Sequence, residues 1–141
     1  MKPPLPSNEA QRLAVLREYD LLDTPPEAAL DELAELAACI CEAPVALISL
    51  IDEERQWFKS RVRFEPAETA RDISFCGYTI LERELFIVPD ARLDPRFCDN
   101  PLVTGETGIR FYAGAPLFTP DGHALGTLCV IDREPREIHP D

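Results

Sequence analysis

Two apolar runs of strand length dominate the hydrophobic pattern in the last third of the chain. Phe111–Phe118 and Ala124–Ile131 are rich in aromatic and branched residues, and they flank the segment 119–122, TPDG. Pro presets φ, Asp hydrogen-bonds its own backbone and Gly tolerates positive φ, so TPDG predicts a turn and the whole stretch a β-hairpin. Neither run alternates between apolar and polar residues. This pattern indicates strands that are covered on both faces and lie inside a sheet.

Helical patterns occupy the N-terminal part of the chain. Asn8 and Gln11 have the spacing of a capping box and predict a helix to about Tyr19. The segment Thr24-Pro25-Pro26-Glu27 gives a second start signal, with Thr as the N-cap and Pro at the first helical position. Pro44 ends the second helix. That helix carries a narrow apolar stripe, formed by Leu30, Leu33, Ala34, Ala37 and Cys41.

Three further strands are predicted between these helices and the hairpin. Val45–Ile51 is uniformly apolar, as in a buried strand, whereas Gln56–Val62 alternates more, as in a strand near a sheet edge. Leu85–Val88 is the third. Phe64–Arg71 reads as a polar loop, and Ser74 is expected to cap a short helix to about residue 82. This order predicts an α+β domain whose mixed, mainly antiparallel sheet has about five or six strands.

Composition narrows the function classes. The 141 residues, 45% hydrophobic and 28% charged, suffice for one core. The formal net charge of −12, from 26 acidic and 14 basic residues, would repel nucleic acid and anionic membranes. No apolar run reaches the roughly 18 residues of a membrane span, and MKPPLPSNEA lacks a signal-peptide core. We therefore expect a cytoplasmic protein with no nucleic-acid partner and no membrane insertion.

The five cysteines form no regular disulfide or zinc pattern. Their odd number fits a reducing compartment and buried thiols. Cys39 and Cys41 lie in a predicted helix, where two positions turn through about 200° and point the side chains apart. His123 and His139 do not complete a ligand set. No metal and no cofactor is assigned.

Several stretches of the chain, in order, match a known family between about Leu13 and Arg136. They read YDLLDTPPE, PVALISLID, RQWFKSRV, RDISFCGYTI, VPDARLDPRFCDNPLVTG, IRFYAGAPL and PDGHALGTLCVID. The sequence resembles a GAF domain, of the subtype found at the N-terminus of bacterial sensor histidine kinases and diguanylate cyclases. The resemblance implies a central antiparallel sheet with the N- and C-terminal helices on one face. On the other face it implies a short helix and a long loop around a pocket.

Two departures from the family pattern bear on the domain's limits. Tyr78 stands where this subtype often has His, and the chain stops at Ile138-His139-Pro140-Asp141, where the family's C-terminal helix would begin. We therefore expect a fragment of a longer signalling protein. Residues 1–7 are expected to be a loose N-terminal segment, 8–136 a single GAF domain, and 137–141 the start of a C-terminal helix or linker.

Three functions are weighed. The favoured one is a regulatory or sensory domain of a bacterial signal-transduction protein, with a histidine kinase or diguanylate cyclase output. It would bind an unknown small molecule, mediate homodimerisation, or both, and would not itself be an enzyme. The alternative is a GAF-type free-methionine sulfoxide reductase with Cys76 and Cys98 as cooperating thiols, although the surrounding residues do not resemble its motifs. A tetrapyrrole photosensor would need a His beside its Cys, where this chain has Gly77-Tyr78.

A small-molecule pocket is predicted between the sheet and Ser74–Thr79, roofed by the loop Asp94–Gly108. The whole connection 91–108 is long for a compact domain, which is typical of a functional loop, and Ala113 and Gly126 leave space on the hairpin. The candidate ligand-binding residues are Ser74, Cys76, Thr79, Asp90, Phe97, Phe111, Ala113, Thr127 and Cys129. The competing interpretation is that large side chains such as Phe58, Phe75 and Phe97 fill the space.

Other polar residues have two interpretations each. Arg71 and Arg110 could clamp an anionic ligand or pair with surface carboxylates, and the second is the commoner arrangement. Asp90 follows a strand and either orients a ligand or caps the loop through an Asx turn. Trp57, on the more exposed face of its strand, could serve a partner interface.

Overall fold

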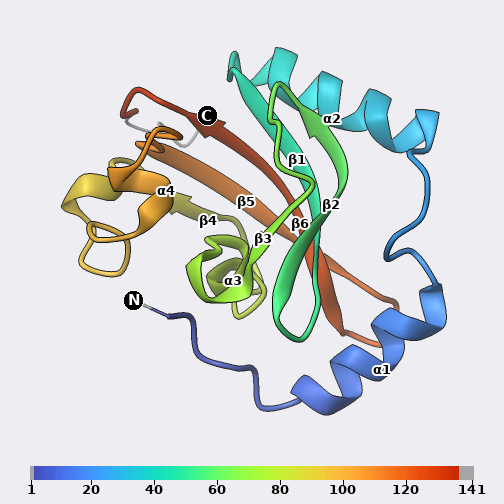
Figure 1. The fold of residues 1–141 in the computed structure, drawn as a ribbon. Coiled ribbons are helices and arrows are strands. Elements are labelled where there is room, and N and C mark those ends of the chain that lie inside the picture. Colours follow the sequence, from blue (N-terminus) through green and yellow to red (C-terminus); the bar gives the residue numbers. More distant parts are fainter. Residues whose placement is uncertain (1, 137–141) are drawn as a thin grey trace.

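A computed structural model describes residues 2–136 of the chain as an open six-stranded antiparallel sheet flanked by helices (Figure 1). The strands are β1 (Val45–Ile51), β2 (Arg55–Val62), β3 (Glu68–Ala70), β4 (Phe86–Val88), β5 (Phe111–Phe118) and β6 (Ala124–Asp132). The helices are α1 (Glu9–Tyr19), α2 (Ala28–Ile40), α3 (Cys76–Thr79) and α4 (Pro101–Thr104), with 3-10 turns η1 (Arg71–Ile73) and η2 (Ala91–Leu93). The α+β prediction is confirmed. The helix or linker expected at 137–141 lies outside the described residues.

The hairpin lies inside the sheet, as its two-faced apolarity predicts. The strand order is β3-β2-β1-β6-β5-β4, so β6 lies between β1 and β5, and β5 between β6 and β4. Gly122 has φ +88°, the conformation that TPDG needs from its glycine. The neighbour β4 is short and pairs only with Tyr112–Gly114. The far end of β5 therefore has one strand partner, and Phe118 there is exposed.

Helices α1 and α2 cover one face of the sheet, here called the helix face. Leu13 and Leu16 of α1 pack with Leu50 and Leu125. Ala34 and Ala38 of α2 are buried among small and branched strand residues. The predicted α2 stripe is therefore only partly right. Leu33 is 42% exposed and Cys41 is also exposed, because the helix presents its alanines to the sheet.

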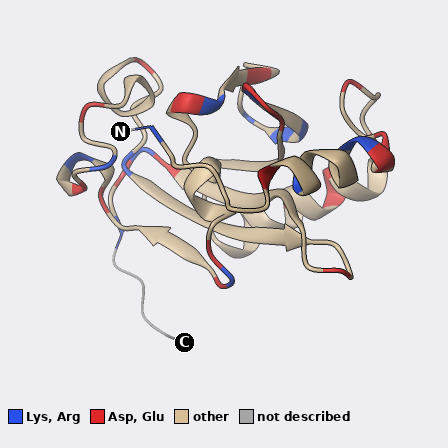
Figure 2. Ribbon diagram, turned by 90° about the horizontal axis from the view of Figure 1, so that it is seen from below, with Lys and Arg blue, Asp and Glu red and all other residues tan. Residues whose placement is uncertain are grey.

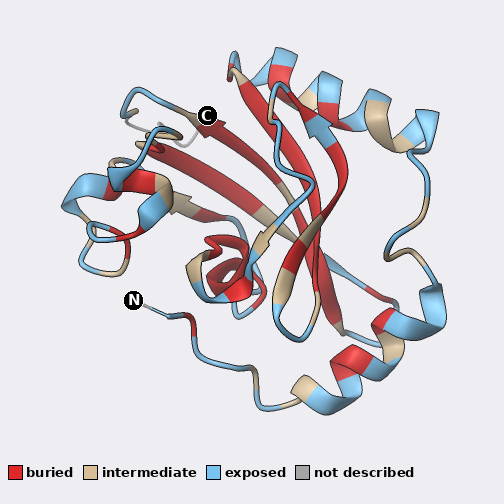
Figure 3. Cartoon of the chain, viewed as in Figure 1, coloured by how far each residue is buried: buried red, intermediate tan, exposed pale blue. Residues whose placement is uncertain are grey.

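The opposite face, here called the α3 face, is covered by α3 and the loop from η2 to α4. Its buried residues include Phe75, Phe97 and Tyr112, which give this side most of the protein's core aromatics. Figure 3 shows the central strands and α3 as buried ribbon, with exposed residues on the outer helices and loops. Figure 2 shows that the Lys, Arg, Asp and Glu residues, like the exposed residues, lie mainly on helices and loops.

The start of α2 differs from the prediction. The sequence predicts Thr24 as the N-cap, but the helix begins at Ala28. The Thr24 hydroxyl instead donates to the Leu21 carbonyl at 2.5 Å and accepts from Lys59 Nζ at 2.6 Å. A buried ammonium needs acceptors, so Thr24 ties the α1–α2 link to β2.

Short elements account for the other differences. The predicted loop 64–71 contains β3, an edge strand without an apolar alternation, and the connection 91–108 contains η2 and α4. At the N-terminus, residues 2–7 form no helix or strand, yet Pro3 is buried. A Cβ on Gly77 would lie 2.7 Å from Pro3 Cγ, so Pro3 packs on α3 at a glycine.

Candidate functional site

Aromatic rings fill the space where the pocket is predicted. Phe75 and Phe97 stack with centroids 4.0 Å apart, and the Tyr78 ring meets Phe97 edge-on at 5.1 Å. Tyr112 extends the layer, 5.2 Å from Phe75. A cavity of about 10 Å³ remains beneath them, which is room for one water molecule at most. The competing interpretation, filling by large side chains, agrees with this geometry.

Beneath the rings lies a buried group of thiols and hydroxyls, here called the thiol–hydroxyl cluster. Its members are Ser49, Cys76, Thr79, Tyr112, Thr127 and Cys129, contributed by β1, α3, β5 and β6. Cys76 Sγ is at its centre. It lies 2.9 Å from Thr127 Oγ1, 3.1 Å from the Tyr112 hydroxyl and 4.0 Å from Cys129 Sγ.

Two further hydroxyls extend the cluster outward. Ser49 Oγ is 2.8 Å from Thr127 Oγ1, and Thr79 Oγ1 is 2.7 Å from the Tyr112 hydroxyl. With Ser49 donating to Thr127, the Thr127 hydroxyl donates to Cys76 Sγ. The Tyr112 hydroxyl can donate to the same sulfur when Thr79 donates to Tyr112 and not to the Phe75 carbonyl, which lies 3.4 Å from Thr79 Oγ1. The arrangement therefore favours a negative charge on that sulfur.

The two thiols differ in acidity. Burial raises the pKa of the Cys76 thiol, but hydrogen bonds from Cys129, Ser49, Thr127 and Tyr112 outweigh burial and lower that pKa to about 7. The hydrogen bond to Cys76, together with burial, raises the pKa of Cys129 well above its ordinary value. Burial and the neighbouring Cys76 likewise raise the pKa of Tyr112. Cys76 is therefore the more acidic thiol, while Cys129 and Tyr112 keep their protons.

Four of the nine predicted site residues meet in this cluster: Cys76, Thr79, Thr127 and Cys129. Sequence reasoning missed Ser49, Tyr112 and the neighbouring Gln56. Ser49 is the polar residue of the otherwise apolar strand β1, and that signal could have identified it, whereas Gln56 lies in β2 among other polar residues and carries no such signal.

Phe111 and Ala113 are placed wrongly by the prediction. Both lie on the helix face, among the residues that pack under α2. The last strand pair before the turn is Phe118–Ala124. If the pairing continued from there without a shift, Ala113 would lie opposite Cys129. A register shift between Leu117 and Phe118 instead places Gly114 there, which turns Tyr112 toward α3. One extra residue in a strand inverts the faces beyond it.

The remaining predicted residues have structural partners. Ser74 Oγ accepts from the Gly77 N–H at 3.1 Å, so Ser74 supports the start of α3 as expected of a cap. Phe97 belongs to the aromatic layer. Asp90 accepts from the Arg92 backbone N–H at 3.1 Å and pairs with the Arg92 guanidinium, which is the Asx-turn alternative.

Neither candidate arginine forms an anion clamp. Arg71 donates to the Asp52 carbonyl and pairs with Glu9, and Arg110 donates to the Val103 carbonyl. The predicted thiol pair is also different. Cys98 is exposed, and the thiol nearest Cys76 is Cys129.

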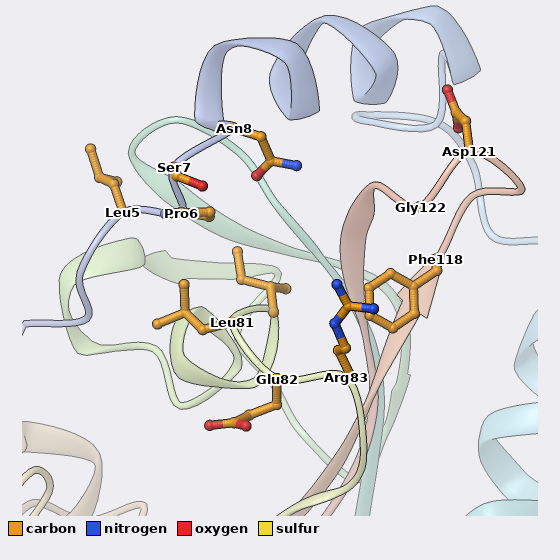
Figure 4. Close-up of a pocket in the computed structure, with 11 residues that line it drawn as sticks. Leu5, Pro6, Ser7, Asn8, Leu81, Glu82, Arg83, Phe118, Asp121 and Gly122 are labelled. Carbon is orange, nitrogen blue, oxygen red and sulfur yellow. The ribbon is translucent and has the colours of Figure 1, made fainter.

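A surface depression lies apart from the cluster. It has a volume of about 880 Å³ and lies between residues 5–8, residues 80–83 and the β5–β6 turn (Figure 4). Leu5, Leu81 and Phe118 line it beside Glu82 and Arg83. These are solvent-exposed surface side chains, so the thiol–hydroxyl cluster remains the stronger chemical site.

The sequence profile of the GAF domain matches residues 25–141. The chain belongs to the GAF domain family. A cyclic di-GMP phosphodiesterase of Pseudomonas aeruginosa is 48% identical over 134 residues, which is 95% of this chain but 23% of that relative. The chain thus matches about a quarter of the length of that relative. The histidine kinase or diguanylate cyclase subtype is not confirmed by this relative.

Solved structures give the same fold. The GAF domain of a phosphoenolpyruvate-protein phosphotransferase from Acinetobacter superposes with a TM-score of 0.62 at 16% identity, covering 96% of this chain and 84% of that one. A type II free methionine-R-sulfoxide reductase from Thermoplasma acidophilum has a TM-score of 0.63 at 9% identity, covering 88% and 82%. At these identities the likeness concerns the fold alone. Within residues 2–136, no helix has the length and apolarity needed to span a membrane.

Proposed function

We propose that this GAF domain is the regulatory input of a longer signalling protein and acts by homodimerisation through α2. The outer face of α2 supports this proposal. Leu33, Leu36 and Ile40 are 42%, 54% and 72% exposed and recur at helical spacing, whereas Ala34 and Ala38 face the sheet. A helix that only covers a sheet buries its large residues. Here the large residues point outward, which suits packing against the same helix of a second copy.

The attached output is proposed to make or degrade cyclic di-GMP. The support is the 48% identity with the P. aeruginosa phosphodiesterase over nearly the whole domain. A change in dimer geometry at the input would then alter the activity of the output, as in other two-state regulators.

A small-molecule input would need a different conformation of the α3 face. The Phe75–Phe97 stack occupies the space between α3 and the sheet. A ligand there would have to displace at least one ring, and its binding energy would be reduced by the cost of that displacement.

The test compares the intact protein with a Leu36→Glu/Ile40→Glu variant. Both side chains are exposed in the single domain, so the variant should fold. Two carboxylates in an apolar interface should convert the dimer to a monomer at tens of micromolar, as measured by light scattering, and should change cyclic di-GMP turnover. Glu35→Gln on the same helix is the matched control. An unchanged molecular mass would overturn the dimer proposal, and an absence of turnover in the unaltered protein would overturn the output proposal.

A further inference from the structure

We propose that Cys76 and Cys129 are a peroxide-reactive thiol pair that closes reversibly to a disulfide between α3 and β6. This inference does not depend on the proposed dimer or output. The Sγ atoms are 4.0 Å apart, in residues 53 positions apart in the chain. Side-chain rotation together with a small shift of α3 would bring them to bonding distance.

The cluster assigns different parts to the two sulfurs. Cys76 Sγ accepts from the Thr127 hydroxyl on β6 and lies 3.1 Å from the Tyr112 hydroxyl on β5, which can also donate to it. Its thiolate is therefore stabilised, and the thiolate is the nucleophilic form. Cys129 keeps its proton beside the Cys76 thiolate, and it is the thiol placed 4.0 Å away that can resolve the sulfenic acid.

A small cavity with mainly apolar walls lies against both sulfurs. The 10 Å³ cavity is lined by Cys76, Cys129 and Gln56. Gln56 is 4% exposed, and its Oε1 has no hydrogen-bond partner, although its Nε2 donates to Thr69. A buried unpaired carbonyl oxygen calls for a donor. Hydrogen peroxide has two O–H groups that can donate to this oxygen, and it is only one heavy atom larger than water. Local opening of residues 74–79 would let it reach the sulfurs.

The reaction balances with hydrogen peroxide as the oxidant. The Cys76 thiolate attacks one peroxide oxygen, the S–O bond forms, the O–O bond breaks and hydroxide leaves, which gives a sulfenic acid. Cys129 sulfur then attacks Cys76 sulfur. The S–S bond forms, the S–O bond breaks, and the Cys129 proton leaves with the hydroxyl as water. The two sulfurs together lose two electrons, and one peroxide is reduced.

The disulfide would change the centre of the α3 face. It would tie α3 covalently to β6, a strand with neighbours on both sides. It would also remove the charged acceptor toward which Tyr112 and Thr127 donate. The exposed cysteines 39, 41 and 98 have no such arrangement and serve as internal references.

The test treats the 141-residue chain with hydrogen peroxide at neutral pH. Catalase stops the reaction, and the protein is unfolded in N-ethylmaleimide and digested for mass spectrometry. We expect Cys76 and Cys129 to lose alkylation in equal amounts, and a cross-linked peptide pair to appear that dithiothreitol removes. Full alkylation of both residues after peroxide has oxidised Cys98 would overturn the proposal.

Two variants separate the two thiols, with circular dichroism as the check on folding. In Cys129→Ser no cross-link forms, and dimedone should trap a sulfenic acid on Cys76. In Cys76→Ser we expect Cys129 to remain reduced. Dimedone labelling of Cys129 in that variant would overturn the assignment of Cys76 as the attacking thiol. If either variant fails to fold, the peptide analysis of the unaltered chain still decides whether the pair reacts.

Discussion

The two faces of the sheet are built from alternate residues of the same strands, yet they differ in chemistry. On β6, Leu128 and Val130 point to the helix face, while Thr127 and Cys129 point to α3. The helix face is filled mainly by alanines and branched aliphatics, and its buried polar residues Arg12, Lys59 and Ser60 pair with α1, α2 and the link between them. The α3 face combines aromatic rings with hydroxyls and thiols that hydrogen-bond one another.

The two faces therefore place different demands on the residues that fill them. Aliphatic packing carries no cost for unpaired polar atoms, so the aliphatic part of the helix face needs only the right volume. Buried hydroxyls and thiols need partners in fixed positions, and a partly satisfied network is worse than an apolar one. The α3 face meets that requirement at Cys76, which receives its hydrogen bonds from two neighbouring strands. We therefore expect reactive groups on the α3 face of the sheet. Dimer contacts are expected on the outer side of α2, which points away from the sheet.

The largest expected effect comes from removing a ring on the α3 face. Phe97 has 0% exposure and stacks on Phe75, so Phe97→Ala should lower the free energy of unfolding by about 3–5 kcal/mol. Urea denaturation measures the change. Phe118→Ala, at an exposed position, is the matched control and should have little effect. A loss below 1 kcal/mol for Phe97→Ala would mean that the rings do not form a packed layer.

A smaller loss is expected from adding volume to the helix face. Ala34 has 0% exposure between α2 and the sheet, and Ala34→Leu should cost about 1–3 kcal/mol because the helix must move away. The same substitution at exposed Ala29 is the control. Equal urea midpoints for the two variants would show that α2 is not closely packed on the strands.

The same comparison explains what the sequence could predict. The uniform apolar runs predict β1 and β5 with their observed bounds, because β1 and the first half of β5 are covered on two faces and both strands end at turn residues. β3 is polar and lies at the edge, so no alternation marks it. The thiols and Thr127 are predicted from their places in the chain. Tyr112 is not, because its face depends on a register shift that no residue pattern reveals.

The smallest expected change in stability tests the cluster itself. Thr127→Val keeps the shape but removes the donor to Cys76 Sγ and the partner of Ser49, which should cost about 1 kcal/mol. It should also raise the pKa of Cys76 from about 7 toward the ordinary value near 9. The other titratable groups facing Cys76 are Cys129 and Tyr112, which stay protonated in this range because both pKa values are raised.

The pH dependence gives the sign of that change. A folded-state pKa below the unfolded value contributes stability that is fully present above the unfolded pKa, near 9, and is lost as pH falls through about 7. The free energy of unfolding of the unaltered protein should therefore increase as the pH rises from about 7 to about 9. For Thr127→Val the increase should be smaller. The rate of peroxide oxidation of Cys76 follows the thiolate fraction. From pH 6 to pH 8 this rate should rise about tenfold in the unaltered protein and closer to a hundredfold in Thr127→Val. Thr127→Ser keeps the hydroxyl and should follow the unaltered protein. Identical pH profiles for the Val and Ser variants would show that the Thr127 hydroxyl does not set the acidity of Cys76.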